Sequence, residues 1–208
     1  NFGDVLTQRT EHYYHKLSAA PAVAAAGAGI ASAHDRVSFK DEVTAADTAP
    51  DARPRRLFLD AWQRADGETV WPQYAAGALR APLMRADFSA PLEGGEVVKT
   101  LTLAGRRLQV DYRLCEVPGG RFSAEINLAM PSCAGFTGRS VLADGSIPCG
   151  FGQPLDLTAT PGLTLEDGVL GGGIVLAASR PVDIRARPHF TVSQSEAGFE
   201  KIMQGVCL

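Results

Sequence analysis

Alternation of apolar and polar residues with a period of two is the feature that most constrains how this chain can fold. It is clearest over residues 108–114, 122–130 and 182–192. Because successive side chains point to opposite faces of a β-strand, each stretch predicts a strand with one apolar and one polar face. The 208 residues include 22 glycines and 13 prolines, and turn dipeptides separate the predicted strands. The sequence therefore predicts an all-β fold, an antiparallel β-sandwich.

The same alternation indicates which side chains form the core. The predicted core residues are Val110, Leu114, Phe122, Ile126 and Leu128. Pro188 lacks the N–H that a strand ladder needs, so it predicts an edge strand or a bulge. Gly171, Gly172 and Gly173 predict a tight turn or bulge before an apolar strand. A short helical turn is expected within residues 195–203.

We expect residues 1–208 to form a single β-sandwich domain. Residues 18–33 are almost entirely Ala and Gly, and they predict a flexible connector or extended loop because such side chains build little core. The chain starts at Asn1 with neither Met nor a signal-peptide pattern. We therefore expect it to be the C-terminal part of a longer protein.

Composition and motifs exclude several classes of function. The formal net charge is −3 and no basic stripe is visible, so no nucleic acid is expected as a partner. No apolar run reaches the ~18 residues of a membrane helix. Phosphate-binding, dinucleotide-binding, metalloprotease and serine-hydrolase motifs are all missing. We expect no cofactor.

The four cysteines are far apart in the sequence and lack the spacing of a zinc site. We expect them to be free thiols, as in a cytoplasmic protein. A disulfide between Cys133 and Cys149 is the alternative in an oxidising compartment.

A cluster of polar residues near the start of the chain is the first candidate site. It contains Arg9, Glu11, His12 and His15. Two imidazoles three residues apart could share a metal ion on one face of a helix. We prefer the simpler interpretation of an exposed polar strip, and so we expect no metal.

Two further sets of polar residues lie on the polar faces of predicted strands. Glu125 and Asn127 share one face, about 7 Å apart along the strand, which suits hydrogen bonds to adjacent sugar hydroxyls or a structural network. Arg185, Arg187 and His189 share one face of another strand, which could bind an anion or a polyol, or simply face water. These five residues are the candidate substrate-binding residues. Trp62, Trp71 and Tyr74 could stack on sugar rings or pack in the core.

Four segments resemble a known family. They are the opening run with Arg9, Glu11, Tyr14 and His15, the segment H-D-R-V-S-F-K-D followed by R-R-L-F-L-D, the strand F-S-A-E-I-N-L-A-M, and the closing V-S-Q-S-E-A-G-F-E-K-I-M-Q-G. Together they resemble the C-terminal β-sandwich domain of glycoside hydrolase family 57 α-amylases and 4-α-glucanotransferases. Ala61-Trp62 stands where that family usually has His-Phe, and Met203 where Tyr is common.

The resemblance implies a galactose-mutarotase-like β-sandwich and a parent enzyme that acts on α-1,4-glucans with retention. A retaining mechanism needs two carboxylates about 5–5.5 Å apart, and in the family both lie on an N-terminal barrel that this chain lacks. No catalytic residue is therefore expected here. The resemblance implies a non-catalytic accessory domain that packs on the barrel and contacts α-glucan or malto-oligosaccharide.

Two other functions compete with this one. The chain could be a stand-alone mutarotase-like epimerase or lyase, with His189 or His34 as the base and Glu125 as the acid. It could also have a purely structural role in the parent protein.

Overall fold

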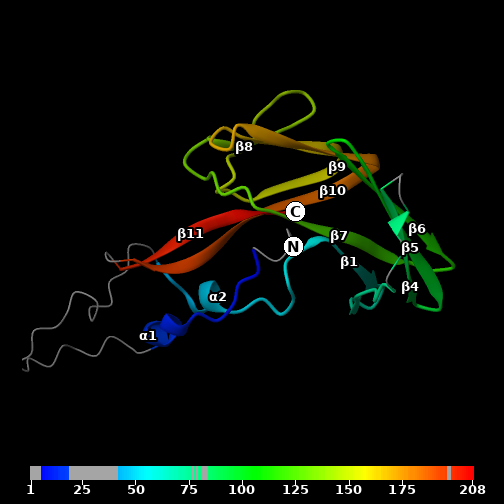
Figure 1. Cartoon of the computed structure of the whole chain (residues 1–208), viewed down its shortest axis with the longest axis horizontal. Helices are drawn as coiled ribbons and strands as arrows, with labels where there is room; N and C mark the ends of the chain where they lie inside the picture. Colours follow the sequence, from blue (N-terminus) through cyan, green and yellow to red (C-terminus); the bar gives the residue numbers. More distant parts are fainter. Residues whose placement is uncertain (1–5, 19–41, 76, 78, 81–83, 196–197) are drawn as a thin grey trace, which may run out of the picture. The chain divides into compact units, whose positions relative to one another are not determined.

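The structure is a computed structural model, and it describes residues 6–18, 42–75, 77, 79–80, 84–195 and 198–208. Antiparallel strands dominate these residues, which confirms the predicted all-β class (Figure 1). Residues 19–33 of the predicted flexible segment lie outside the described residues. The chain divides into two compact units, Asn1–Phe58 with Glu125–Leu208 (the larger unit) and Leu59–Ala124 (the smaller unit). The prediction of one domain over the whole chain stays a prediction.

The larger unit contains a short N-terminal helical segment and most of one sheet. Its elements are η1 (His12–Tyr14), α1 (His15–Ser18), α2 (Ala45–Thr48), β8 (Gly138–Val141), β9 (Leu155–Asp167), β10 (Gly172–Ser195) and β11 (Gly198–Cys207). The strands β1 (Leu57–Arg64) and β7 (Gly120–Leu128) each run from one unit into the other. In the larger unit the strand order is β7-β11-β10-β9-β8.

The strand β10 organises this sheet because it pairs on both sides. Figure 1 shows it beside β9 over its first half and beside β11 over its second. The β10–β11 register shifts between His189 and Phe190, directly after Pro188, so the predicted bulge is confirmed. Of the turn predicted at Gly171–Gly173, Gly171 lies in the turn that joins β9 to β10, whereas Gly172 and Gly173 already pair with β9 as the first residues of β10.

The helical turn expected within residues 195–203 is wrong. Residues 198–203 belong to β11, which pairs with β10 from Ser195↔Gly198 onward. A partner strand satisfies the backbone N–H and C=O groups of this segment, and that pairing overrides a weak local preference.

Apolar side chains form two clusters in the larger unit. The first contains Met130, Phe151, Leu163, Leu165, Ala186, Met203 and Val206. The second contains Tyr14, Val192 and Phe199. The hydroxyls of Tyr13 and Tyr14 both donate to the carbonyl oxygen of Val192, at 3.0 and 3.3 Å. These bonds attach the N-terminal helical segment to β10.

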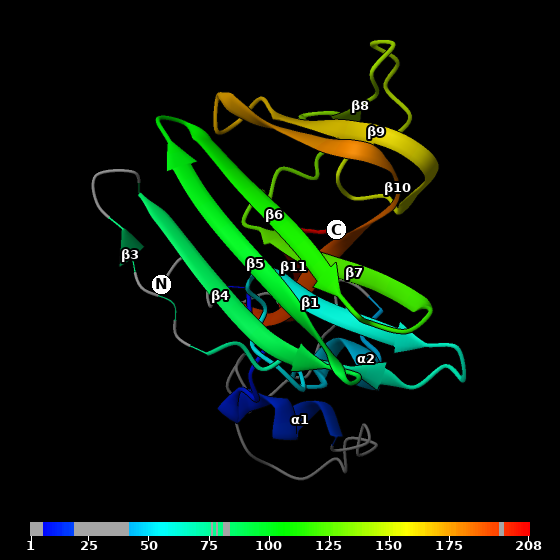
Figure 2. The ribbon, with the colours of Figure 1, turned by 90° about the vertical axis from the view of Figure 1, so that its right-hand side faces the viewer.

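The smaller unit contains two sheets that pack face to face. Its own strands are β2 (Thr69–Val70), β3 (Leu79–Arg80), β4 (Arg85–Leu92), β5 (Gly95–Ala104) and β6 (Arg107–Cys115). Figure 2 shows β4, β5 and β6 side by side, and the second sheet has the order β2-β1-β7. Trp62 of the second sheet packs with Ala90, Leu92 and Val97 of the first, so this unit is a small sandwich.

The predicted core is partly correct. Phe122 and Leu128 pack against buried clusters, and Val110 and Ile126 are half-buried. The prediction that Leu114 is a core residue is wrong. Its side chain is 40% exposed, because β6 is the edge strand of its sheet. On β7 the most buried side chain is Asn127, which is only 4% exposed.

Candidate functional site

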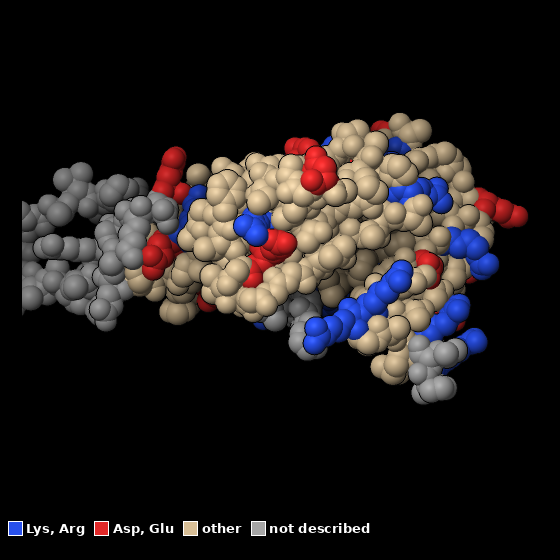
Figure 3. All heavy atoms as spheres, turned by 90° about the horizontal axis from the view of Figure 1, so that it is seen from above, with Lys and Arg blue, Asp and Glu red and all other residues tan. Residues whose placement is uncertain are grey.

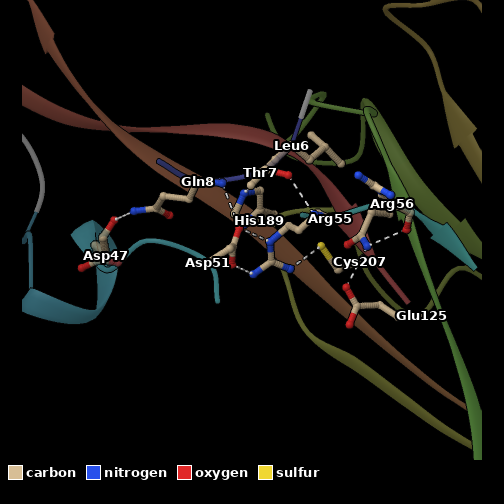
Figure 4. A network of polar contacts seen from close by, with 11 residues as sticks. Leu6, Thr7, Gln8, Asp47, Asp51, Arg55, Arg56, Glu125, His189 and Cys207 are labelled. Atoms are coloured by element: carbon tan, nitrogen blue, oxygen red, sulfur yellow. Dashed lines mark hydrogen bonds and ion pairs between the residues drawn. The ribbon is translucent and has the colours of Figure 1, made fainter. Parts of the chain in front are cut away.

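The candidate site is a pocket of about 350 Å³ in the larger unit. Its lining includes Glu125, Arg185, Arg187 and His189, four of the five residues that the sequence singles out. Arg55 and Cys207 line it as well (Figure 4). Asn127, the fifth predicted residue, is not part of the lining.

Strand pairing explains how these side chains meet. Arg187 lies opposite Cys207 in the β10–β11 register, and Cys207 lies opposite Asn127 in the β11–β7 register. The strand β11 thus lies between the two strands that carry the predicted residues. Glu125 and Arg187, 62 positions apart in the chain, reach the same pocket because only one strand separates theirs.

His189 is buried, not on a solvated face. It is 7% exposed, and its Nε2 donates to the carbonyl oxygen of Leu6 at 2.7 Å. Burial lowers the pKa of His189, and the neighbouring Arg55 charge lowers it further, so the imidazole is neutral near pH 7. With Nε2 holding the N-terminal segment, His189 acts as a structural residue of the pocket wall.

Arg55 is the central residue that sequence reasoning missed. Its Nε and Nη2 donate to the two carboxylate oxygens of Asp51, each at 2.7 Å, and its Nη1 contacts the Sγ of Cys207 at 3.3 Å. Figure 4 shows the guanidinium between these two partners. An acid four positions before an arginine is a recognisable spacing, but it gives no sign of a contact 152 residues away.

The charges around Arg55 fix the protonation states nearby. Burial alone would raise the pKa of Asp51, but hydrogen bonds from Arg55 and from the Gln8 backbone N–H outweigh it and lower that pKa. Burial raises the pKa of the Cys207 thiol, an effect that Arg55 only partly offsets. Cys207 is therefore a protonated thiol near neutral pH, and it is a poor nucleophile.

The remaining side chains differ in how many hydrogen bonds and ion pairs they already make within the protein. Arg187 donates from Nη2 to both carboxylate oxygens of Asp156, at 2.7 and 2.9 Å, and from Nη1 to two backbone carbonyls. Asn127 donates to the carbonyl oxygen of Arg56 at 2.9 Å and to Glu125 at 2.7 Å. Arg185 is exposed, and no described residue forms an ion pair with it. Arg185 and Glu125 are thus the groups best able to contact a ligand.

The lining of this pocket offers polar groups that can bind hydroxyl groups. Glu125 is the only carboxylate among its lining residues, whereas general acid–base or retaining glycosidic chemistry needs a second, suitably placed group. The lining offers guanidinium donors and a carboxylate acceptor, which suit hydroxyl groups. Among the residues that the structure describes, no group of three or more His, Cys, Asp or Glu could hold a metal ion.

Three of the other residues considered from the sequence, His15, Trp62 and Tyr74, make contacts within the protein. His15 Nδ1 contacts the backbone oxygen of His12 within the N-terminal helical segment. Trp62 is buried in the core of the smaller unit, and Tyr74 packs against it. His34 lies outside the described residues. On the molecular face seen in Figure 3, acidic and basic side chains are interspersed.

A second polar network lies inside the smaller unit and centres on Asp60. Its carboxylate accepts hydrogen bonds from Tyr74 and Tyr112, both at 2.7 Å, and from Lys99 at 2.8 Å. Burial, together with the Asp60 charge, raises the pKa of both tyrosines. Both phenols therefore keep their protons and act as donors. The network is closed around its own carboxylate.

Comparison with known proteins gives two results. A family model described as the C-terminal part of α-amylase/4-α-glucanotransferase matches residues 1–208. The crystal structure of 4-α-glucanotransferase from Thermococcus litoralis is similar, with a TM-score of 0.64 and 20% sequence identity. That match covers 100% of this chain and 31% of the other, so this chain spans about a third of that protein's length. No curated protein matches the chain. The family match gives no support to the alternative of an epimerase or lyase.

Proposed function

Because this chain belongs to the family of α-amylase/4-α-glucanotransferase C-terminal domains, we propose that it is the non-catalytic accessory domain of an enzyme acting on α-glucans. The family match over the whole length is the observation that carries this proposal. The pocket supports it, since a single carboxylate among its lining residues cannot provide the pair that retaining hydrolysis needs. We place the parent enzyme in glycoside hydrolase family 57, on the motifs quoted above.

The smaller unit offers a surface for the catalytic domain of the same polypeptide. Four large apolar side chains, which we call the apolar sheet end, are between 43% and 64% exposed: Leu79, Met84, Leu103 and Leu108. Leu103 and Leu108 lie opposite each other in the β5–β6 register. An exposed cluster of this kind is typical of an interaction surface. About two thirds of the glucanotransferase chain lies outside the match, and we propose the corresponding part of the parent as the occupant.

Charged side chains around the apolar sheet end define the partner further. Arg106 and Arg107, in and directly after the β5–β6 turn, are exposed, whereas Arg80 and Arg85 make ion pairs with Asp87. A partner surface with an apolar centre and an acidic rim would be complementary.

The pocket in the larger unit is the proposed contact for α-glucan or a malto-oligosaccharide. Arg185 and Glu125 would bind sugar hydroxyls as donor and acceptor. His189, Asn127 and Arg187 would keep the pocket in shape, because each of them already donates hydrogen bonds within the protein. Among the described residues that line the pocket there is no Phe, Tyr or Trp, so we expect weak binding by the isolated chain, in the millimolar range (about −4 kcal/mol).

A cytoplasmic location is part of the proposal. All four cysteines are free thiols in the structure, as is usual where the cell keeps thiols reduced. No helix of the described chain is long and apolar enough to cross a membrane.

Thiol labelling tests whether the catalytic domain covers the apolar sheet end. We expect Leu108→Cys to be alkylated at least tenfold more slowly in the parent polypeptide than in the isolated chain, measured by peptide mass spectrometry. Gln109→Cys, on the opposite face of the same strand, is the control and should react equally in both. Equal rates for Leu108→Cys in both proteins would contradict the proposal. So would slow labelling of the isolated chain that depends on its concentration, because a second copy would then be the occupant.

A further inference from the structure

A second hollow, of about 550 Å³, lies in the larger unit and is separate in its lining from the pocket described above. Its lining includes Phe136, Arg139, Thr164, Glu166, Gly173 and Val175, and we call it the hairpin platform. Its volume is within the range of small-ligand sites, about 300–1,000 Å³.

The strand register builds the floor of the hairpin platform. Arg139 lies opposite Glu166, and Glu166 lies opposite Gly173, so the three form one row across β8, β9 and β10. Thr164 and Val175 form the next row on the same face, two residues along. Leu163 and Leu165, on the other face of β9, are fully buried. The platform is therefore the outer face, and Gly173 lies in its floor, where a Cβ would meet the Leu165 backbone oxygen at 2.8 Å.

An exposed aromatic ring borders this floor. Phe136 is 60% exposed and lies in a tight turn in which the Thr137 N–H donates to the Ala134 carbonyl oxygen at 3.1 Å. Gly135 has a positive φ of 59° there, and a Cβ at Gly150 would meet the Gly135 oxygen at 2.3 Å. The turn is thus fixed by backbone packing. A phenyl ring held in water by a fixed turn is suited to stacking on the C–H face of a sugar ring.

A neutral ion pair lies in the first row. Arg139 contacts Glu166 through Nε at 2.9 Å and through Nη2 at 2.8 Å, and both contacts end on Oε2. Both side chains are 43% exposed. No described residue bonds to Glu166 Oε1 or to Arg139 Nη1, so one acceptor and one donor remain side by side. Such a pair fits two adjacent hydroxyls, and its balanced charge disfavours an anionic ligand.

The turn between β9 and β10 is held rigidly at the edge of the platform. Asp167 Oδ1 accepts hydrogen bonds from the Ser132 hydroxyl at 2.6 Å and from the Val169 and Leu170 N–H groups at 3.0 and 2.9 Å. These bonds connect the turn to the loop that precedes Phe136. A site that is already ordered loses less entropy when it binds.

We propose that the hairpin platform is a surface binding site for α-1,4-linked glucan chains. Phe136 stacks on one sugar ring, Arg139 and Glu166 bind two neighbouring hydroxyls, and the hollow at Gly173 takes the ring itself. The choice of ligand rests on the proposed function, but the site is new: it gives the domain a contact to polymer that shares no lining residue with the Glu125 pocket.

An NMR titration of the labelled 208-residue chain with maltohexaose tests this site. We expect saturable shifts in the amides of residues 136–139 and 168–173, with an affinity in the millimolar range and smaller shifts with cellohexaose. Phe136→Ala should weaken the binding at least tenfold, and Phe136→Trp should preserve it. Ile147→Ala, which removes another exposed apolar side chain of the same unit outside the lining, should change nothing.

Several results would overturn the site. They are the absence of these shifts at the highest soluble sugar concentration, an unchanged affinity in Phe136→Ala, and equal shifts with inorganic phosphate. If maltohexaose shifts only the amides around Glu125 and Arg185, the platform fails while the proposed function stands. The proposed function fails separately, if the parent polypeptide does not act on α-glucans.

Discussion

The two units each contain a network of polar side chains around a carboxylate, and the two networks differ in what they leave free. In the smaller unit, the carboxylate of Asp60 accepts hydrogen bonds from Tyr74, Tyr112 and Lys99, and the Asp60 side chain is fully buried. In the larger unit, the Asp51–Arg55 pair is also satisfied, but it supports the wall of a pocket. Burial and charge alone therefore do not mark a binding site. A binding site is marked by a donor or acceptor beside a hollow that no protein group uses.

The largest effect is expected when the closed network is broken. Asp60→Ala would leave the Lys99 ammonium and two phenols without their acceptor in the core, and we expect a loss of about 3–5 kcal/mol in the free energy of unfolding. Urea denaturation would measure it. Asp111→Asn, an exposed carboxylate of the same unit, is the control and should stay within about 0.5 kcal/mol. A loss below about 1 kcal/mol for Asp60→Ala would show that the network is not buried as described.

The Asp51–Arg55 pair of the larger unit should tolerate the loss of one partner better than the Asp60 network does. Arg55→Ala removes the partner of Asp51, but both side chains keep some access to water, 26% and 16%, and Asp51 retains the Gln8 N–H. We expect a loss of about 1–2 kcal/mol in the same denaturation experiment. A loss equal to that of Asp60→Ala would remove the distinction between the two networks.

Local patterns predict the strands of this protein but not how they meet. The alternation over residues 108–114 and 122–130 lies within β6 and largely within β7, because the two-residue period is set by neighbours in the chain. The pocket depends on pairings such as Arg187↔Cys207 and Cys207↔Asn127, which no local pattern contains. The hydrogen bond of His189 is likewise made to the carbonyl oxygen of Leu6, 183 residues away.

The same limit explains the errors. Leu114 and Asn127 both follow the alternation, yet Leu114 is exposed on an edge strand, whereas Asn127 is buried and bonded to the Arg56 carbonyl oxygen. A period of two assigns side chains to faces, but the neighbouring strands decide which part of a face is covered.

Arg185 should affect binding without affecting stability. Its guanidinium is the pocket donor that no described residue pairs with, so Arg185→Ala should weaken maltotetraose binding about threefold to tenfold, or roughly 1 kcal/mol. Calorimetric titration at millimolar concentrations would measure it. Arg180→Ala removes another exposed arginine of β10 outside the pocket lining and is the matched control. Equal losses in the two variants would indicate a general charge effect and not a pocket.

The smallest effect is expected from the titration of His189. Its pKa is lowered in the folded protein, so the unfolded chain binds a proton first as the pH falls below about 6.5. The stability is therefore fully present above that pH and decreases as the pH falls towards the folded pKa. His189→Gln should flatten the pH dependence of the unfolding free energy between about pH 7 and 5. An unchanged slope would mean that His189 remains protonated or exposed in the folded protein.

The central claim is that this chain assists glucan chemistry carried out elsewhere in its polypeptide. The most direct measurement compares the purified 208-residue chain with the parent polypeptide, following the release of reducing ends and of glucose from malto-oligosaccharides. We predict turnover by the parent and none by the isolated chain. Turnover by the isolated chain that Glu125→Gln abolishes would contradict this account, because the chemistry would then lie in this domain.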